Sequence, residues 1–187
     1  RKFYFAGDFT MRVKYQKARI AKLERGRLVA PQEEAGGFAP DQAFIIESLE
    51  YEVLPSGEEA VTASGRAFEG FFDERLVLPA SGLAYDEQSG KAETVMKYYV
   101  GRNAGAGATA NRKLLGLSVA PDLARGPTVT YQGRYQTVAD MLSEIARLAD
   151  LGWEVAYDSV SSAFVFDCIP GADHSAASSA PVYFDID

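Results

Sequence analysis

The sequence predicts a mixed α+β fold, in which antiparallel strands form the first third of the chain and helices follow. Residues 9–16 alternate apolar and polar side chains, which is the period of a strand with one buried face. Two further alternating segments flank the turn sequence 55–57, which predicts a β-hairpin. In the last quarter, a segment of helical period precedes two short strand-like segments.

The first third is expected to form part of an antiparallel barrel or sandwich. The strand side chains expected on the apolar faces are Phe9, Met11, Val13, Tyr15, Leu49, Tyr51 and Val53. Residues 30–43 hold two prolines and two glycines and predict a loop. The hairpin runs from residue 44 to 54, turns, and returns through 60–63.

The middle of the chain changes to a helical pattern. A short helix is predicted where four apolar side chains share one face, namely Ala67, Phe68, Phe71 and Phe72. Residues 79–90 predict a loop, and residues 92–102 predict a second helix that ends at 103–105. Residues 114–119 predict a strand.

The last quarter carries the clearest helix. Thr137 and Asp140 have the spacing of a capping box, and Gly152 is expected to supply the left-handed residue that ends the helix. Its apolar stripe consists of Val138, Met141, Leu142, Ile145 and Leu148. Residues 153–157 and 163–168 then predict a hairpin that packs with this helix.

The composition excludes several protein classes. The chain has 187 residues, 47% of them apolar, which suits one ordinary domain or two small interlocked ones. No apolar run approaches the length of about 18 residues that spans a bilayer, and the first residues do not form a signal peptide. Because the chain opens at Arg1 and ends in the strand-like residues 181–187, we expect a fragment of a longer protein.

The charge is distributed unevenly. Residues 1–27 carry nine Lys or Arg and two acids, whereas the whole chain has a net charge of −7. The basic side chains considered for a nucleic-acid contact are Arg12, Lys14, Lys17, Arg19, Lys22, Arg25 and Arg27. The acidic remainder would repel phosphates, so a solvated strand face or a subunit contact is the favoured interpretation.

The candidates for catalysis are few. Cys168, the only cysteine, lies in an apolar run and is expected to be a small buried hydrophobe. His174 stands between Asp173 and Ser175, but sequence neighbours rarely converge as a triad, so we expect a solvated turn. Ser118 lies in a weak match to a nucleophile elbow that lacks the second glycine.

Phosphate and metal sites are equally unsupported by the sequence. The glycine-rich residues 105–111 follow a predicted helix instead of a strand, and no P-loop ending is present. Asp185 and Asp187 share a strand face, but the EF-hand pattern is absent. Glu47 shares the parity of the apolar face and is expected to pair with Arg66 or to lie at a barrel rim. We therefore predict no catalytic, cofactor-binding or metal-binding residues, no cofactor, and a protein that is not an enzyme.

The order of these features resembles the siphovirus and prophage tail-hub proteins, of the baseplate hub-like, ReqiPepy type. The residues that carry the resemblance, from about Phe5 to the end, are Ser64-Gly65-Arg66-Ala67-Phe68, Arg75, Glu93-Thr94-Val95-Met96-Lys97-Tyr98-Tyr99-Val100, Asn103, Arg112, the helix from Val138, Leu151-Gly152-Trp153, Phe164-Val165-Phe166-Asp167, Gly171, Asp173 and Val182-Tyr183-Phe184. His174 departs from the pattern, because the family is expected to have Arg after the Asp.

The resemblance implies an antiparallel β-barrel-like module, residues 1–63 plus 175–187, interlocked with an inserted α+β module, residues 64–174. It implies a structural component of a phage tail tip or baseplate hub, synthesised in the bacterial cytoplasm, that works by self-assembly. The implied partners are copies of itself in a homo-oligomer, expected to be a trimer, and the neighbouring tail tube and tail tip proteins, with no membrane contact. The alternatives are a tail-associated cell-wall hydrolase, which would need two facing carboxylates, or a nucleic-acid contact through the basic N-terminal arm.

Overall fold

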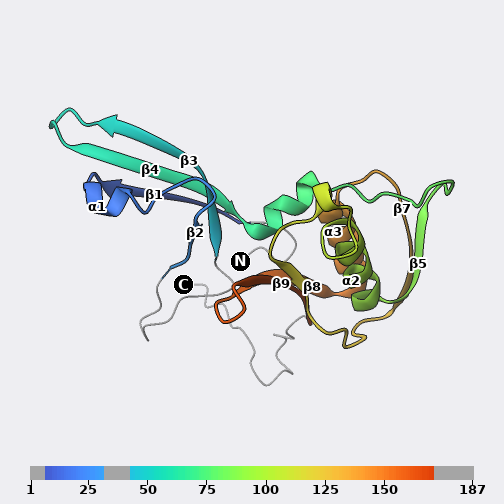
Figure 1. Ribbon diagram of the computed structural model, residues 1–187. Coiled ribbons are helices and arrows are strands. Elements are labelled where there is room, and N and C mark those ends of the chain that lie inside the picture. The colour runs from blue at the N-terminus through green and yellow to red at the C-terminus, as the bar shows by residue number, and fades with distance from the viewer. Residues whose placement is uncertain (1–6, 32–42, 171–187) are drawn as a thin grey trace, which may run out of the picture.

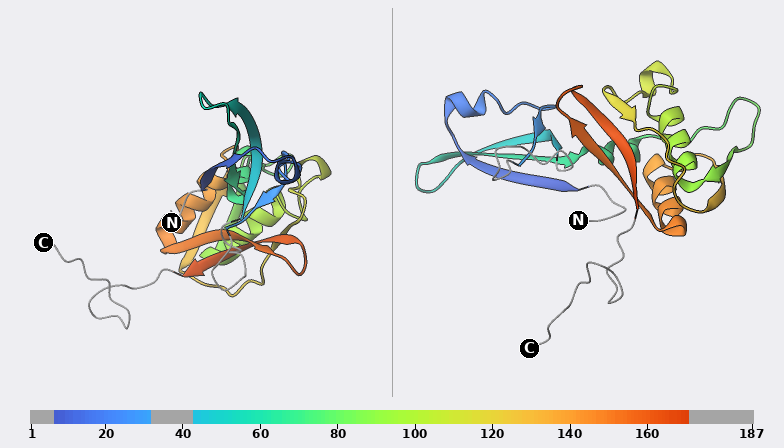
Figure 2. Two further views of the ribbon diagram at one scale, coloured as in Figure 1. Left: turned by 90° about the vertical axis from the view of Figure 1, so that its left-hand side faces the viewer. Right: turned by 90° about the horizontal axis from the view of Figure 1, so that it is seen from below.

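The computed structural model describes residues 7–31 and 43–170, and this part of the chain divides into an extended sheet and a compact helical half (Figures 1 and 2). We call the described residues up to 67 the arm, and residues 68–170 the body. In chain order the elements are β1 (Asp8–Lys14), α1 (Lys17–Ile20), β2 (Leu28–Val29), β3 (Phe44–Val53), β4 (Glu59–Ala67), η2 (Phe68–Glu74), β5 (Asp86–Lys91), α2 (Ala92–Asn103), η3 (Ala110–Arg112), β6 (Leu117–Val119), β7 (Thr128–Gly133), α3 (Val138–Ala149), β8 (Leu151–Asp158) and β9 (Ala163–Pro170). The predicted α+β class is thus confirmed.

The arm is a curled, half-barrel sheet with the strand order β1-β4-β3-β2. All its pairings are antiparallel, and the register places Met11 and Leu49 on either side of Ala63. Because directly opposed residues point to the same face, the apolar side chains predicted on both segments share one face of the sheet. The β3–β4 hairpin forms as predicted, and Gly57 adopts a positive φ of 80° in its turn.

A bulge in β3 changes the predicted position of Glu47. Ile46 pairs with Gly65 and Ser48 pairs with Ser64, so Glu47 is an extra residue without a partner in β4. The predicted parity of Glu47 with the apolar face is therefore wrong, because the bulge interrupts the period of two. Beside the bulge the strands approach so closely that a Cβ at residue 65 would lie 1.9 Å from the carbonyl oxygen of Ile45, which requires glycine there.

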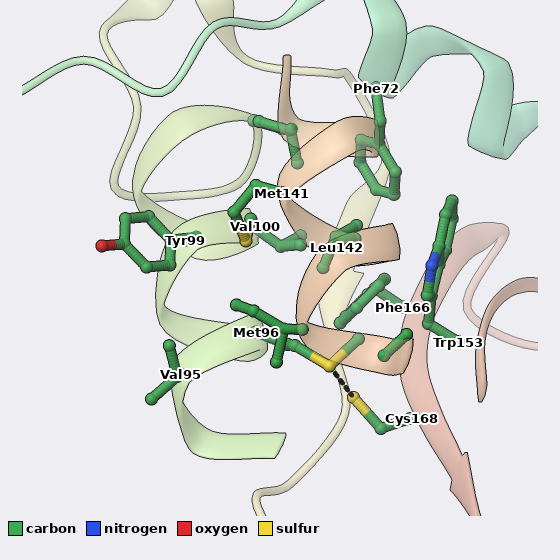
Figure 3. Packing of buried hydrophobic residues seen from close by; sticks show 14 of the residues in the cluster. Phe72, Val95, Met96, Tyr99, Val100, Met141, Leu142, Trp153, Phe166 and Cys168 are labelled. Carbon is green, nitrogen blue, oxygen red and sulfur yellow. Dashed lines mark hydrogen bonds between the residues drawn. The ribbon is translucent and has the colours of Figure 1, made fainter. Parts of the chain in front are cut away.

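The body is built around α2 and α3, with η2, β8 and β9 packed against them (Figure 3). Its large side chains without exposed surface include Phe72, Met96, Tyr99, Leu142 and Phe166. The ring of Phe72 lies 5.8 Å from that of Trp153 and 5.9 Å from that of Phe166, which joins η2 to the β8–β9 hairpin. The predicted union of helix and hairpin is confirmed.

The start of α3 is as predicted, because the Oγ of Thr137 accepts a hydrogen bond from the backbone N–H of Asp140. Two other details of this helix differ from the prediction. The residue in left-handed conformation at the other end is Asp150, with φ of 50°, whereas Gly152 lies within β8. Leu148 is 73% exposed, because the stripe drifts around the helix and Ala149 takes the inward position.

The strands of the body are also only partly as predicted. β6 lies within the predicted segment and pairs in parallel with β9. The predicted loop 79–90 is wrong after residue 85, because β5 pairs with β7 in a two-stranded ribbon. The side chains of β5 are mostly polar, so they show no apolar alternation.

The predicted division into two interlocked modules stays a prediction. One of its segments, residues 175–187, lies outside the described residues. The other boundary falls within β4, which continues to Ala67 and leads directly into η2.

Candidate functional site

The surface of the arm is the first candidate for a functional site, since β1 lies at its edge. Within the described ranges β1 pairs only with β4, over all seven of its residues. Phe9, Met11 and Val13 are half-buried on one face, and the residues between them are exposed. An edge strand with an apolar face can pair with a strand of another chain.

The apolar face of the arm is incompletely covered. Val13, Val61 and Tyr51 form one row across three strands, since Val61 is the register partner of both others. Val61 in the central strand is fully buried, whereas Tyr51 is 62% exposed and Val53 is 70% exposed. The distal half of the hairpin, which projects from the body in Figure 1, therefore presents apolar side chains to solvent.

The opposite face of the arm carries ion pairs and hydroxyl contacts. Arg12 lies 2.6 Å from Glu52, and Lys14 lies 2.5 Å from Glu58. The hydrogen bond from Lys14 holds the pKa of Glu58 below its usual value. Both pairs are exposed, and pairs of this kind contribute little to the stability of a fold.

These contacts also bear on the basic residues considered for nucleic acid. Arg27 lies 2.8 Å from Glu24, and the Nε of Arg25 donates to the carbonyl oxygen of Glu47. Four of the seven basic side chains thus have partners within the arm itself. A phosphate backbone would have to compete with these contacts for the same side chains.

Arg66 links the arm to the body. Its guanidinium lies 2.8 Å from Glu47, contacts Glu74, and donates to the carbonyl oxygen of Gly70 at 3.0 Å. It also lies 4.5 Å above the ring of Phe71. The predicted ion pair between Glu47 and Arg66 is confirmed, and its function here is to fix the end of β4 against η2.

A buried ionic network ties α2 to the loop before β7 and to β9. Glu93 has no exposed surface, and its carboxylate lies 2.6 Å from Lys97 and 2.8 Å from Arg125. Asp167 completes the network at 2.7 Å from Lys97 and 2.9 Å from Arg125. Burial alone would raise the pKa of Glu93, but the hydrogen bonds from Arg125 and Lys97 outweigh it and hold this pKa well below its usual range.

Our sequence analysis did not identify this network. Its one local signal is the i,i+4 spacing of Glu93 and Lys97 beside the apolar side chains of α2. The other two members of the network, Arg125 and Asp167, come from distant parts of the chain. Each carboxylate has two cationic partners, so the network holds no group free to act as an acid or base.

Cys168 lies in the body core, as predicted. It is fully buried, and its Sγ lies 4.0 Å from the Sδ of Met96 (Figure 3). Burial raises the pKa of the Cys168 thiol to about 12. A thiol that is neutral and enclosed in this way is a poor nucleophile.

The remaining candidates do not form a reactive site in the described part of the chain. The hydroxyl of Ser118 lies within β6 and donates to the carbonyl oxygen of Phe164, so the serine is not on a nucleophile elbow. Gly105 and Gly107 pack closely on the backbone at the end of α2, and their N–H groups donate to the carbonyl oxygens of Val100 and Gly101. The candidates that lie outside the described residues are Asp173, His174, Ser175, Asp185 and Asp187.

The described residues contain neither a cluster of metal ligands nor a helix able to span a membrane. In residues 7–31 and 43–170, no three His, Cys, Asp or Glu side chains gather in a way that could hold a metal ion. Over the same ranges, no helix has both the length and the apolar character that crossing a bilayer demands.

Comparison with protein families identifies the family of the chain. A family model described as Siphovirus ReqiPepy6 Gp37-like protein matches residues 1–187. No curated protein matches the chain.

Proposed function

The chain belongs to the family of Siphovirus ReqiPepy6 Gp37-like proteins, and on this premise we propose that it is a structural component of a phage or prophage tail tip or baseplate hub. The family indicates a phage protein of the structural kind, associated with the virion. The finer assignment, a hub at the tail tip, is our proposal. This assignment is supported by the order of sequence motifs along the chain, which resembles that of the tail-hub proteins.

The uncovered apolar face of the arm is the observation that supports this proposal. A sheet of this size normally buries one face, yet Tyr51 and Val53 remain largely exposed beside the buried Val61. The adjacent edge strand β1 offers backbone hydrogen bonds to a further strand. Together these features fit a surface that is completed by another chain in an assembly.

We propose that the occupant of this surface is a second copy of the same chain, in a closed ring of three. A closed ring uses two different faces of each subunit, so the arm of one copy would contact another region of the next. The other proposed partners are the tail tube and tail tip proteins above and below the ring. The two-module division of the chain belongs to the same proposal.

Light scattering coupled to size-exclusion chromatography tests self-assembly directly. We expect the unaltered chain to shift from monomer towards trimer as its concentration rises. The double variant Tyr51→Lys with Val53→Glu places charges on the exposed apolar face and is expected to remain monomeric. Its melting temperature should change little, because both side chains are already exposed in the monomer.

Val160→Lys is the matched control. Val160 is 94% exposed, but it lies in the β8–β9 turn of the body and is not one of the apolar side chains of the arm sheet. This variant should associate like the unaltered chain. A chain that stays monomeric at high concentration, or equal association of all three proteins, would contradict the proposal.

A further inference from the structure

A small pocket in the body brings two arginines together. It has a volume of about 320 Å³ and is lined by Glu74, Arg75, Leu76, Leu78, Asn111 and Arg112. These residues come from two segments, one made of the end of η2 and residues 75–78 after it, the other made of η3. Neither segment contributes to the exposed apolar face of the arm, so the pocket is a separate feature of the molecule.

The two arginines are held in place by each other's segments. The Nε of Arg75 donates to the carbonyl oxygen of Arg112 at 2.8 Å, and an Nη of Arg112 donates to the carbonyl oxygen of Leu76. These two bonds clamp the segments together. A guanidinium has five N–H groups, and no further bond to the rest of the described chain is recorded for Arg112, so the clamp uses only part of its capacity.

The charge at the pocket is only partly compensated. Glu74 is the one carboxylate among the lining residues, and one of its oxygens is bound to Arg66. Its other oxygen lies 3.7 Å from Arg75, and no described carboxylate is within ion-pair distance of Arg112. Burial, and second to it the positive charge of Arg75, lower the pKa of Arg112. A bound anion would relieve this repulsion.

We propose that the pocket binds a carboxylate group through Arg75 and Arg112. The planar guanidinium matches the planar carboxylate in two parallel hydrogen bonds, and Leu76 and Leu78 give the pocket apolar walls for the chain that carries it. In an assembly, such a group is available on the side chain of an acidic residue or at the C-terminus of a neighbouring protein. The binding chemistry is the same for both sources.

Nuclear magnetic resonance of the arginine Nε–H groups, in the 187-residue chain, tests this proposal at constant ionic strength. The probes are a terminally blocked glutamate, an acetylated leucine with a free C-terminal carboxylate, inorganic phosphate, and sodium chloride as reference. We expect saturable shifts of Arg75 and Arg112 with one or both carboxylate probes. The probe that binds more tightly identifies the source, a side chain or a C-terminus.

The variants separate binding from the clamp. Arg112→Gln should weaken carboxylate binding about tenfold or more, because a charge-assisted pair is lost. Arg112→Lys keeps the charge but loses the planar guanidinium. Its affinity for the carboxylate probes should lie between those of the unaltered chain and Arg112→Gln. Lys113→Gln removes the same charge from the adjacent exposed residue, which does not line the pocket, and should bind like the unaltered chain.

The outcomes that overturn the proposal are equally clear. They are shifts no larger than those from chloride, a preference for phosphate with no carboxylate binding, or equal weakening by Lys113→Gln. If Arg112→Gln lowers the melting temperature, Arg112→Lys and the direct titration of the unaltered chain still decide. Self-association does not enter the readout, so failure here leaves the proposed tail function untouched.

Discussion

The arm and the body contain comparable amounts of β-structure, but they bury their side chains in different ways. In the body, two helices close over the strands, and large residues such as Phe72, Tyr99 and Phe166 have no exposed surface. In the arm, fully buried side chains are fewer, among them Ile46, Val61 and Ala63, and the hairpin end exposes Tyr51. Among residues 7–31 and 43–170, the body thus has a closed core, whereas the arm has an open face.

The difference shows where stability and function are located in this molecule. Burial of apolar surface stabilises a fold by about 25 cal/mol per Å², so most of the stabilisation must come from the body. The arm is held by strand pairing and exposed ion pairs, which contribute little individually. An open, moderately stable sheet joined to a stable body suits a protein that is completed on assembly.

The largest effect is expected from a cavity in the body. Phe72→Ala removes a fully buried ring that contacts Trp153 and Phe166, and we expect a loss of about 3–5 kcal/mol in the free energy of unfolding. Urea denaturation followed by circular dichroism measures it. A loss below about 1 kcal/mol would mean that the body core is not the main source of stability.

The buried network should give the next largest effect. Glu93→Gln removes the negative charge that compensates Lys97 and Arg125. We expect the free energy of unfolding to fall by about 3 kcal/mol at pH 7. Because the pKa of Glu93 is lower in the folded than in the unfolded state, its stabilisation is present above the unfolded pKa of about 4.3 and declines as the pH falls below it. The unaltered chain should therefore lose more stability than the variant between pH 6 and pH 3.5, as measured by urea denaturation.

Glu50→Gln is the control for that comparison. Glu50 lies on the exposed polar face of β3 in the arm, and the same chemical change there should have little effect at either pH. Identical pH slopes for the unaltered chain and Glu93→Gln would show that the network does not stabilise the fold.

The junction between arm and body should give an intermediate effect. Arg66→Met removes the contacts with Glu47, Glu74 and the carbonyl oxygen of Gly70, and we expect a loss of about 1–2 kcal/mol. Glu47→Gln breaks only one exposed contact and should cost less than about 1 kcal/mol. Hydrogen exchange should show faster opening of β4 in the Arg66 variant than in the Glu47 variant. The reverse order would place the junction elsewhere.

The smallest effect is expected at the open face of the arm. Tyr51→Ala removes a ring that is already exposed, so the free energy of unfolding of the monomer should change by less than about 0.5 kcal/mol. Urea denaturation at a concentration where the chain is monomeric measures it. A loss comparable with that of Phe72→Ala would remove the distinction between arm and body.

The features that the sequence predicted correctly are those that depend on neighbouring residues. The cap formed by Thr137 and the turn at Gly57 are set within a few residues, and the apolar stripe of α3, apart from Leu148, follows from its period of 3.6. The pairing of Glu47 with Arg66 was also predicted, although its premise, a place for Glu47 on the apolar face, is wrong. The candidate surface on the arm was predicted in part, because basic and apolar side chains alternate along the first strand.

Other features required contacts between distant segments. Asp167 and Arg125 join Glu93 across gaps that no local pattern spans, and β5 becomes a strand only because β7 lies beside it. Asp150 takes the left-handed conformation because Leu151 already begins β8 and is buried against the core.

The sequence by itself determined the fold class, the order of helices and hairpins, and a family whose members are phage proteins, since periodicity and turn chemistry act over short distances. The tertiary structure decided which of the apolar faces was closed. The stripe of α3 packs against the rest of the body core and is buried. The face that carries Tyr51 meets too little of the described chain to be covered. Local patterns specify that a face is apolar, but only the packing of distant segments determines whether that face belongs to the core or remains as a surface.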